Sequence, residues 1–97
     1  MSDAKVGFCE IELYLPGVTS LKEKRGIIKS MLAKMRNQFN IANAEVGKLD
    51  SWQSSTIAIT TVSNSTSHVH KTIQNVMKWI ESRFPDAMIV NHETEIL

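Results

Sequence analysis

Apolar and polar residues alternate along residues 6–15, and this pattern predicts a β-strand with one buried face. Four apolar residues occupy one phase: Cys9, Ile11, Leu13 and Leu15. Three other residues occupy the opposite phase, which should face solvent: Glu10, Glu12 and Tyr14. Pro16 and Gly17 follow. They should end the strand, because proline removes a backbone donor and glycine suits a turn.

Two later segments repeat their apolar residues at the spacing of an α-helix. The first covers residues 21–39 and begins at Ser20 and Glu23, which form a capping box. Its apolar face contains Leu21, Ile28, Leu32, Met35 and Phe39, with Asn40 as a candidate C-terminal cap. The second covers residues 65–83, with Asn64 or Ser65 as the cap, and Pro85 should stop it. Its stripe contains Val69, Ile73, Val76, Met77 and Ile80.

Three further strands complete the pattern, at residues 41–46, 56–62 and 88–96. Residues 56–62 are β-branched almost throughout, which favours a central strand, although either phase could face the core. In the last strand one phase contains Met88, Val90, His92 and Ile96, and the other contains Ile89, Asn91, Glu93 and Glu95. The order β-α-β-β-α-β predicts an α+β fold over residues 1–97, as a single ferredoxin-like domain. It should be a two-layer sandwich of a four-stranded antiparallel sheet with both helices on one face.

Composition narrows the class of protein without identifying a partner. Eleven Lys and Arg against ten Asp and Glu leave a net charge of +1 in 97 residues. A lone Cys9 excludes an intramolecular disulfide and is expected to behave as a small core hydrophobe. The sequence lacks a signal-peptide pattern and any apolar run of about 20 residues, so we expect a cytoplasmic protein with no membrane partner.

Several sequence words occur in order along nearly the whole chain. They include Ile11-Glu12-Leu13 with Leu15-Pro16, Ser20-Leu21-Lys22-Glu23-Lys24-Arg25, Ala44-Glu45-Val46-Gly47, Asp50 with Trp52-Gln53, and Val62-Ser63-Asn64. On these words the chain resembles the YlxP-like family, small bacterial proteins described as a domain of unknown function. The resemblance implies a ferredoxin-like fold and a link to translation or ribosome maturation, because genes of this family often lie among such genes. It supplies no catalytic or binding residues.

A row of cations on the first predicted helix is the best candidate site. Six of the eleven cations lie between Lys22 and Arg36, against Glu23 alone. At 100° per residue, four of them fall within an arc of roughly 60° beside the apolar stripe. We call these four the basic ridge: Lys22, Arg25, Lys29 and Arg36. A focused row of cations attracts phosphates, so the ridge predicts binding of RNA or ribosomal particles. The alternatives are an ordinary solvated helix face, or an acidic protein partner.

The second candidate surface is the open face of the sheet, where four carboxylates should gather: Glu10, Glu12, Glu93 and Glu95. Such a face repels phosphate and would suit a protein partner or a weak homodimer instead. The candidate contact residues for a partner are Tyr14 on this face, and Trp52 and Gln53 in the polar stretch after residues 47–50. For Trp52 we expect packing over one end of the core rather than contact with a partner. The spacing of His68, His70 and His92 predicts no metal site. No cofactor motif or catalytic constellation is present, so we expect no enzyme activity.

Overall fold

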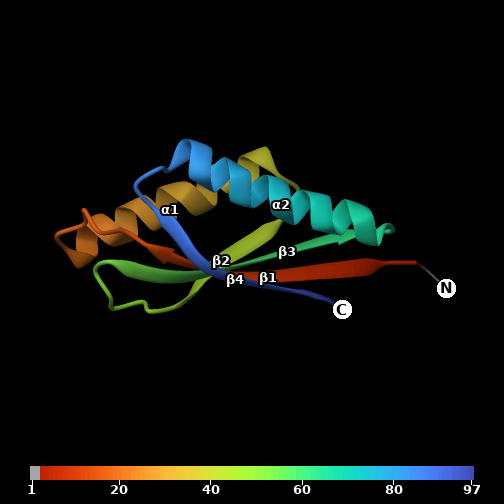
Figure 1. Cartoon of the computed structure of the whole chain (residues 1–97), viewed down its shortest axis with the longest axis horizontal. Coiled ribbons are helices and arrows are strands. Elements are labelled where there is room, and N and C mark those ends of the chain that lie inside the picture. The colour runs from red at the N-terminus through yellow and green to blue at the C-terminus, as the bar shows by residue number, and fades with distance from the viewer. Residues whose placement is uncertain (1–2) are drawn as a thin grey trace.

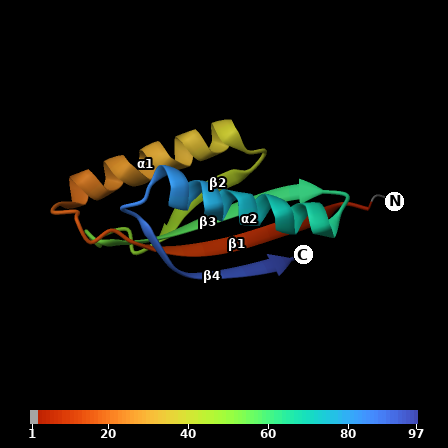
Figure 2. The ribbon, with the colours of Figure 1, turned by 45° about the horizontal axis from the view of Figure 1, so that its top comes forward.

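The computed structural model describes residues 3–97 and confirms the predicted order of elements. The strands are β1 (Lys5–Tyr14), β2 (Ala42–Gly47), β3 (Ser54–Ser63) and β4 (Met88–Ile96), and the helices are α1 (Leu21–Gln38) and α2 (Thr66–Arg83). The strands form one antiparallel sheet in the order β2-β3-β1-β4. Both helices cover the same face of this sheet (Figures 1 and 2). The fold is therefore the expected ferredoxin-like α+β sandwich.

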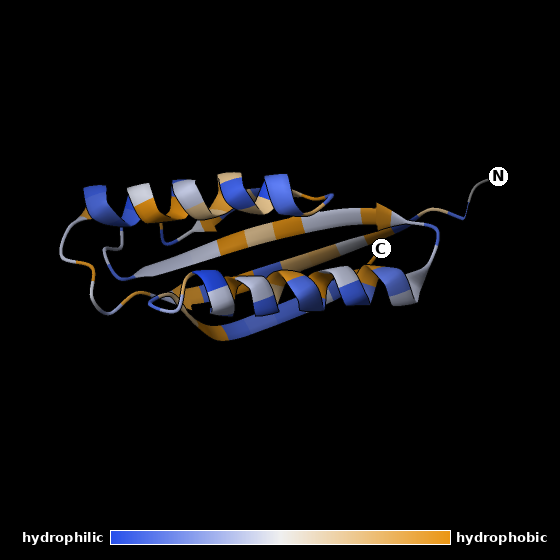
Figure 3. Cartoon of the chain, turned by 90° about the horizontal axis from the view of Figure 1, so that it is seen from above, coloured by the Kyte–Doolittle hydropathy of each residue, from blue (hydrophilic) through white to orange (hydrophobic). Residues whose placement is uncertain are grey.

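The core lies between the sheet and the two helices, where the predicted apolar phases meet. Cys9, Ile11, Leu13 and Leu15 are all buried, as their alternation predicted. The helices add two buried stripes: Ile28, Met31, Leu32 and Met35 from α1, and Val69, Ile73, Val76 and Ile80 from α2. Seen from above, each helix alternates between hydrophilic and hydrophobic residues, as an amphipathic helix should (Figure 3). At Gly7 the packing leaves no room for a side chain, because a Cβ there would overlap Val69 Cγ1.

Serine caps set the start of both helices. Ser20 Oγ accepts a hydrogen bond from the Glu23 amide at 3.1 Å, and Ser65 Oγ accepts one from the His68 amide at 3.2 Å. Each bond satisfies a first-turn amide that has no partner inside the helix. The C-terminal end of α1 differs from the expectation: Phe39, in an extended conformation with φ of −129°, is its cap, and not Asn40.

Pairing with β1 shows which face of β3 and which face of β4 packs on the core. In β3, Ile57 and Ile59 face the core opposite Ile11 and Cys9, so the alternative phase through Ala58 and Val62 lies on the open face. In β4 the predicted alternation holds from Asn91 to Ile96 but is wrong at the start of the strand, because the register shifts between Glu12 and Leu13 of β1 and leaves Val90 unpaired with that strand. This bulge reverses the phase of Met88 and Ile89. Ile89 therefore packs on the core, while Met88 is 52% exposed.

Within residues 3–97, neither helix has the length and apolar character needed to cross a membrane.

Candidate functional site

The four residues of the basic ridge are all exposed on α1, and two of them, Arg25 and Arg36, contact β2 or the loop after it. Arg36 Nη1 donates to Asn43 Oδ1 on β2 at 2.6 Å, and Arg25 Nη2 lies 3.5 Å from Asp50 Oδ1 in the following loop. Lys22 and Lys29 form no ion pair with any other residue in the described part of the chain. From Lys22 to Arg36 the ridge extends about 21 Å at the rise of an α-helix. The structure thus brings the four predicted cations into one row on the surface.

Lys24 belongs to the same sequence word but lies on the inner side of α1 and is fully buried. Its Nζ donates to Glu45 Oε2 at 2.8 Å and to the carbonyl oxygens of Lys48 and Leu49 at 3.0 and 3.3 Å. Ser55 Oγ donates to the same carboxylate oxygen of Glu45 at 2.7 Å. An ammonium group has three donors, and here each has an acceptor. Lys24 therefore connects α1 to β2 and to the turn after it.

Gln53 and Lys48 hold the same end of the molecule together. Gln53 Nε2 donates to the carbonyl oxygens of Pro16 and Val18, at 3.1 and 3.0 Å, so its amide protons are used within the chain. Lys48 adopts a left-handed φ of 56°, and its carbonyl accepts from Lys24 in that turn. Sequence reasoning missed this role, because partners 21 to 37 positions apart leave no local pattern.

Trp52, a candidate contact residue, lies outside the core. Its side chain is 56% exposed, and the neighbouring Leu49 is also exposed. The expectation that Trp52 packs over one end of the core was therefore wrong. Tyr14 is 40% exposed on the open sheet face and pairs with Met88 of β4. The structure does not place Tyr14, Trp52 and Gln53 in one hydrogen-bonded site.

The open face of the sheet carries the four expected carboxylates. Glu10 on β1 lies directly opposite Glu93 on β4, and Glu95 is opposite Phe8. Glu12 has a distant partner, since its Oε1 is 3.9 Å from Lys48 Nζ. Like charges in directly opposed cross-strand positions are unfavourable. This face is therefore acidic and unsuited to a phosphate backbone.

The Cys9 thiol is buried in the core. Burial raises the pKa of the Cys9 thiol, and the nearby Glu10 carboxylate raises it further, against the lowering effect of a hydrogen bond from Thr94 Oγ1 at 3.5 Å. A thiol with a raised pKa is a poor nucleophile at neutral pH. Among residues 3–97 no three His, Cys, Asp or Glu side chains converge where they could hold a metal ion.

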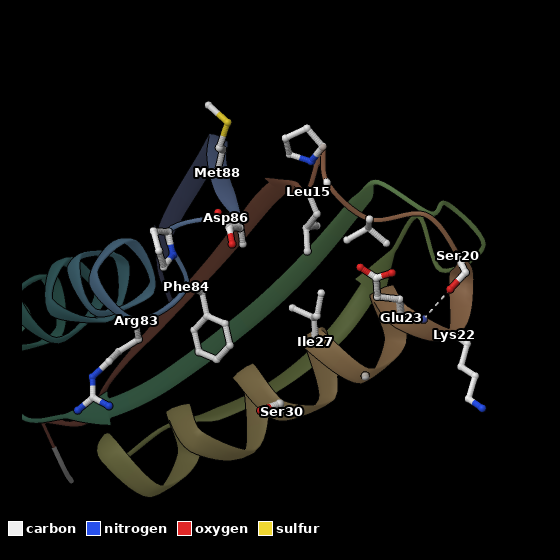
Figure 4. A pocket seen from close by; sticks show the side chains of 16 residues that line it. Leu15, Ser20, Lys22, Glu23, Ile27, Ser30, Arg83, Phe84, Asp86 and Met88 are labelled. Carbon is white, nitrogen blue, oxygen red and sulfur yellow. Dashed lines mark hydrogen bonds between the residues drawn. The ribbon is translucent and has the colours of Figure 1, made fainter.

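A hollow that the sequence did not indicate lies between the first half of α1 and the end of α2. Its volume is about 940 Å³. We call it the α1 groove. Its apolar lining comes from three segments: Leu15, Val18, Ile27, Phe84, Ala87 and Met88. In Figure 4 the side chains of Leu15, Ile27 and Phe84 point into the hollow, whereas those of Lys22 and Arg83 point away from its centre. The groove is thus an apolar trough with charged residues along its rim.

Charge is divided between the helices and the rest of the chain. The helices contain nine of the eleven Lys and Arg residues and only two of the ten acids, which gives them a net charge of +7. The strands and loops then carry −6, and the near-neutral total hides the difference. A phosphate-bearing partner is attracted to the helical side and repelled from the sheet side.

Comparison with known proteins gives one family and one fold. Residues 6–94 match the family described as "Protein of unknown function (DUF503)". The chain is 38% identical over 81 residues to the "Uncharacterized protein YlxP" of Bacillus subtilis (strain 168), which covers 84% of this chain and 87% of that protein. Among solved structures it is similar to the "De novo designed protein Foldit4", with a TM-score of 0.52 and 10% identity over 97% of this chain and 96% of that one. At such low identity this likeness concerns the fold alone. The family match and the relative together show that the chain belongs to the DUF503 family of YlxP-like proteins.

Proposed function

We propose that this protein is a non-catalytic accessory factor of translation or ribosome maturation, and that it contacts RNA through the basic ridge of Lys22, Arg25, Lys29 and Arg36. The observation that carries the proposal is the division of charge, with +7 on the helices and −6 on the strands and loops. The link to translation that the family resemblance implies supports RNA as the polyanion.

The division of charge also gives the orientation of the complex. The helical layer faces the phosphates, and the acidic open face points away from them. Because the ridge makes charge contacts and lacks an array of exposed aromatic side chains, binding should tolerate many sequences and should weaken steeply with salt.

The test compares two double variants that remove the same charge from different helices. Lys22→Gln/Lys29→Gln removes two ridge cations, and Lys71→Gln/Lys78→Gln removes two exposed cations of α2. Binding to ribosomal particles and to a structured ribosomal RNA fragment is measured between about 50 and 200 mM salt, the range over which phosphate contacts lose most of their affinity. The ridge variant should lose about 1.4 to 1.8 units of the slope of log K against log salt, since each phosphate contact contributes about 0.7 to 0.9. The α2 variant should keep the wild-type slope.

A second ridge variant makes the test decisive. Removing all four cations by alanine substitution should release the protein from ribosomal particles at low salt. Retention equal to that of the wild type would reject the ridge as the contact surface.

A protein-binding or homo-oligomeric module is the second candidate function. Exposure of Leu49, Trp52, Tyr14 and Met88 around the sheet favours it, because exposed apolar side chains mark contact surfaces. Opposed Glu10 and Glu93 disfavour symmetric face-to-face pairing, so we expect a monomer or a weak dimer through an edge strand. Sedimentation at several protein concentrations and two salt concentrations measures this. A tight micromolar dimer that buries all four glutamates would favour the second candidate over the first.

A further inference from the structure

A second, smaller hollow lies next to the α1 groove, where the last turns of α1 and α2 are side by side (Figures 2 and 3). Its volume is about 380 Å³, which is within the range of about 300–1,000 Å³ that is usual for small-ligand sites. Among the described residues that line it, two are cations and none is an acid, whereas the α1 groove has cations and acids in equal number. We call it the helix-end hollow, and its lining residues are Lys34, Asn37, Gln38, Trp79, Arg83 and Phe84.

Two aromatic side chains of the hollow, Trp79 and Phe84, are held in place by the core. Their ring centroids are 5.7 Å apart with the planes tilted by 56°, and on its other side Trp79 meets Phe39 edge to face at 6.0 Å. All three rings are partly buried and pack against the core cluster. Rings that are fixed before a ligand arrives lose little conformational freedom when it binds. Trp79 and Phe84 therefore form a rigid aromatic floor on which a planar ligand can stack.

Polar groups surround this aromatic floor and select the ligand. Lys34 Nζ lies 5.7 Å from the centroid of the Phe84 ring, and neither Lys34 nor Arg83 forms an ion pair with another residue between 3 and 97. Asn37 and Gln38 are exposed, and each amide offers a donor and an acceptor, as the edge of a nucleobase does. A cation in the last turn, such as Arg83, also favours the helix itself, but helix stability requires neither the rings nor the amides. A ring face, amide groups and unpaired cations together match the base and the phosphate of a nucleotide.

We propose that the helix-end hollow binds one unpaired nucleotide of an RNA strand. The base stacks on the aromatic floor, the two amide side chains of α1 bond its edge, and a phosphate beside it pairs with Lys34 and Arg83. This inference rests on RNA binding as the proposed function and adds a site for one base. Lys34 lies on the α2 side of α1, whereas Arg25 and Arg36 of the basic ridge contact β2 or the loop after it. A strand that crosses the exposed outer face of α1 therefore reaches both the ridge and the hollow.

The test follows the fluorescence of each tryptophan separately, because the chain has two. Trp52→Phe leaves Trp79 as the reporter of the hollow, and Trp79→Phe leaves the exposed Trp52 between β2 and β3. Each full-length variant is titrated with a single-stranded adenylate hexamer, with an abasic hexamer of the same ribose-phosphate backbone, and with adenosine monophosphate. The adenylate hexamer should quench Trp79. The abasic hexamer should bind at least about fivefold more weakly, since one stacked base contributes a factor of about five or more.

A matched pair of substitutions locates the site. Asn37→Glu and Asn75→Glu make the same change at exposed helix positions, the first inside the hollow and the second on α2 outside it. In the Trp52→Phe chain, Asn37→Glu should weaken the adenylate hexamer at least about fivefold, because it removes an amide that bonds the base and places a carboxylate beside the phosphate. Asn75→Glu should stay within about twofold at physiological salt, which screens distant surface charges. Melting curves check that both variants are folded.

Several results would overturn the proposal. They are an unquenched Trp79, quenching of Trp52 alone, equal affinity for the abasic hexamer, and equal affinities of Asn37→Glu and Asn75→Glu. Adenosine monophosphate that binds as tightly as the hexamer would overturn the assignment to an RNA strand.

The alanine variant of all four ridge residues, titrated in the same assay, distinguishes failure of the hollow from failure of the ridge. Quenching of Trp79 that persists in this variant, together with unchanged retention on ribosomal particles, would support the hollow and reject the ridge. Ridge-dependent retention on ribosomal particles without any quenching of Trp79 would support the ridge and reject the hollow.

Discussion

Lys24 differs sharply from its neighbours Lys22 and Arg25, although all three lie within one turn of α1. Lys24 is fully buried, and its three acceptors are Glu45 and two carbonyl oxygens of the turn after β2. Lys22 and Arg25 are exposed. The 100° step of the helix turns the middle residue toward the core edge and its neighbours toward solvent. Neighbouring charged residues in a sequence can therefore lie in different environments, and the helical phase decides which of them a partner can reach.

The largest expected effect comes from removing the buried charge. Lys24→Met leaves the Glu45 carboxylate with the Ser55 hydroxyl but without its cation, and leaves two carbonyl oxygens without the Lys24 donor. Breaking a buried pair in this way typically costs about 3–5 kcal/mol. We expect a loss of about 3 kcal/mol, near the lower end, because 15% of the Glu45 side chain stays exposed. Urea denaturation measures the change, with Lys22→Met as the matched control on the exposed side. Equal denaturation midpoints for the two variants would remove the distinction between the two environments.

A double variant measures the interaction free energy between Lys24 and Glu45, apart from the cost of burying either charge alone. Lys24→Met/Glu45→Met removes both charges and should be less destabilised than the two single variants together, with a coupling on the order of 1–3 kcal/mol. The double-mutant cycle uses the same denaturation assay. Strict additivity would mean that Glu45 does not interact energetically with Lys24.

The cap at the start of the same turn should have an intermediate effect. Ser20→Ala removes the acceptor of the Glu23 amide and should cost about 1 kcal/mol of unfolding free energy. Ser20→Asp is the control, because aspartate is also a strong N-cap residue. An unchanged midpoint for Ser20→Ala would show that this cap contributes little to α1.

The smallest effect on stability should come from the exposed ridge. Lys29→Gln removes a cation that makes no ion pair with other residues between 3 and 97, so its unfolding free energy should stay within about 0.5 kcal/mol of the wild type. Its RNA salt slope should still fall by almost one unit. Thermal unfolding and RNA titration on the same sample test both halves. A large loss of stability would place Lys29 with Lys24 as a structural residue.

Local patterns predicted most of the fold. Alternation in β1, helical spacing in α1 and α2, and the cap at Ser20 each act within a few residues, and these were read correctly. For the second helix the sequence left Asn64 and Ser65 as alternative caps, and the structure shows Ser65. The bulge at Val90 was missed, because it depends on the register with β1. The same distinction applies to the candidate site. The basic ridge could be predicted because it depends only on helical phase. The buried position of Lys24 and the α1 groove depend on segments far apart in the chain.

The division of charge between helices and sheet gives the molecule a large electric dipole despite a net charge of only +1. In the field of a polyanion such a dipole experiences a torque that turns the helical layer forward before contact, which raises the fraction of productive encounters. The same property should show in chromatography. At neutral pH and low salt the protein should be retained by both cation-exchange and anion-exchange resins, each binding the opposite side of the molecule.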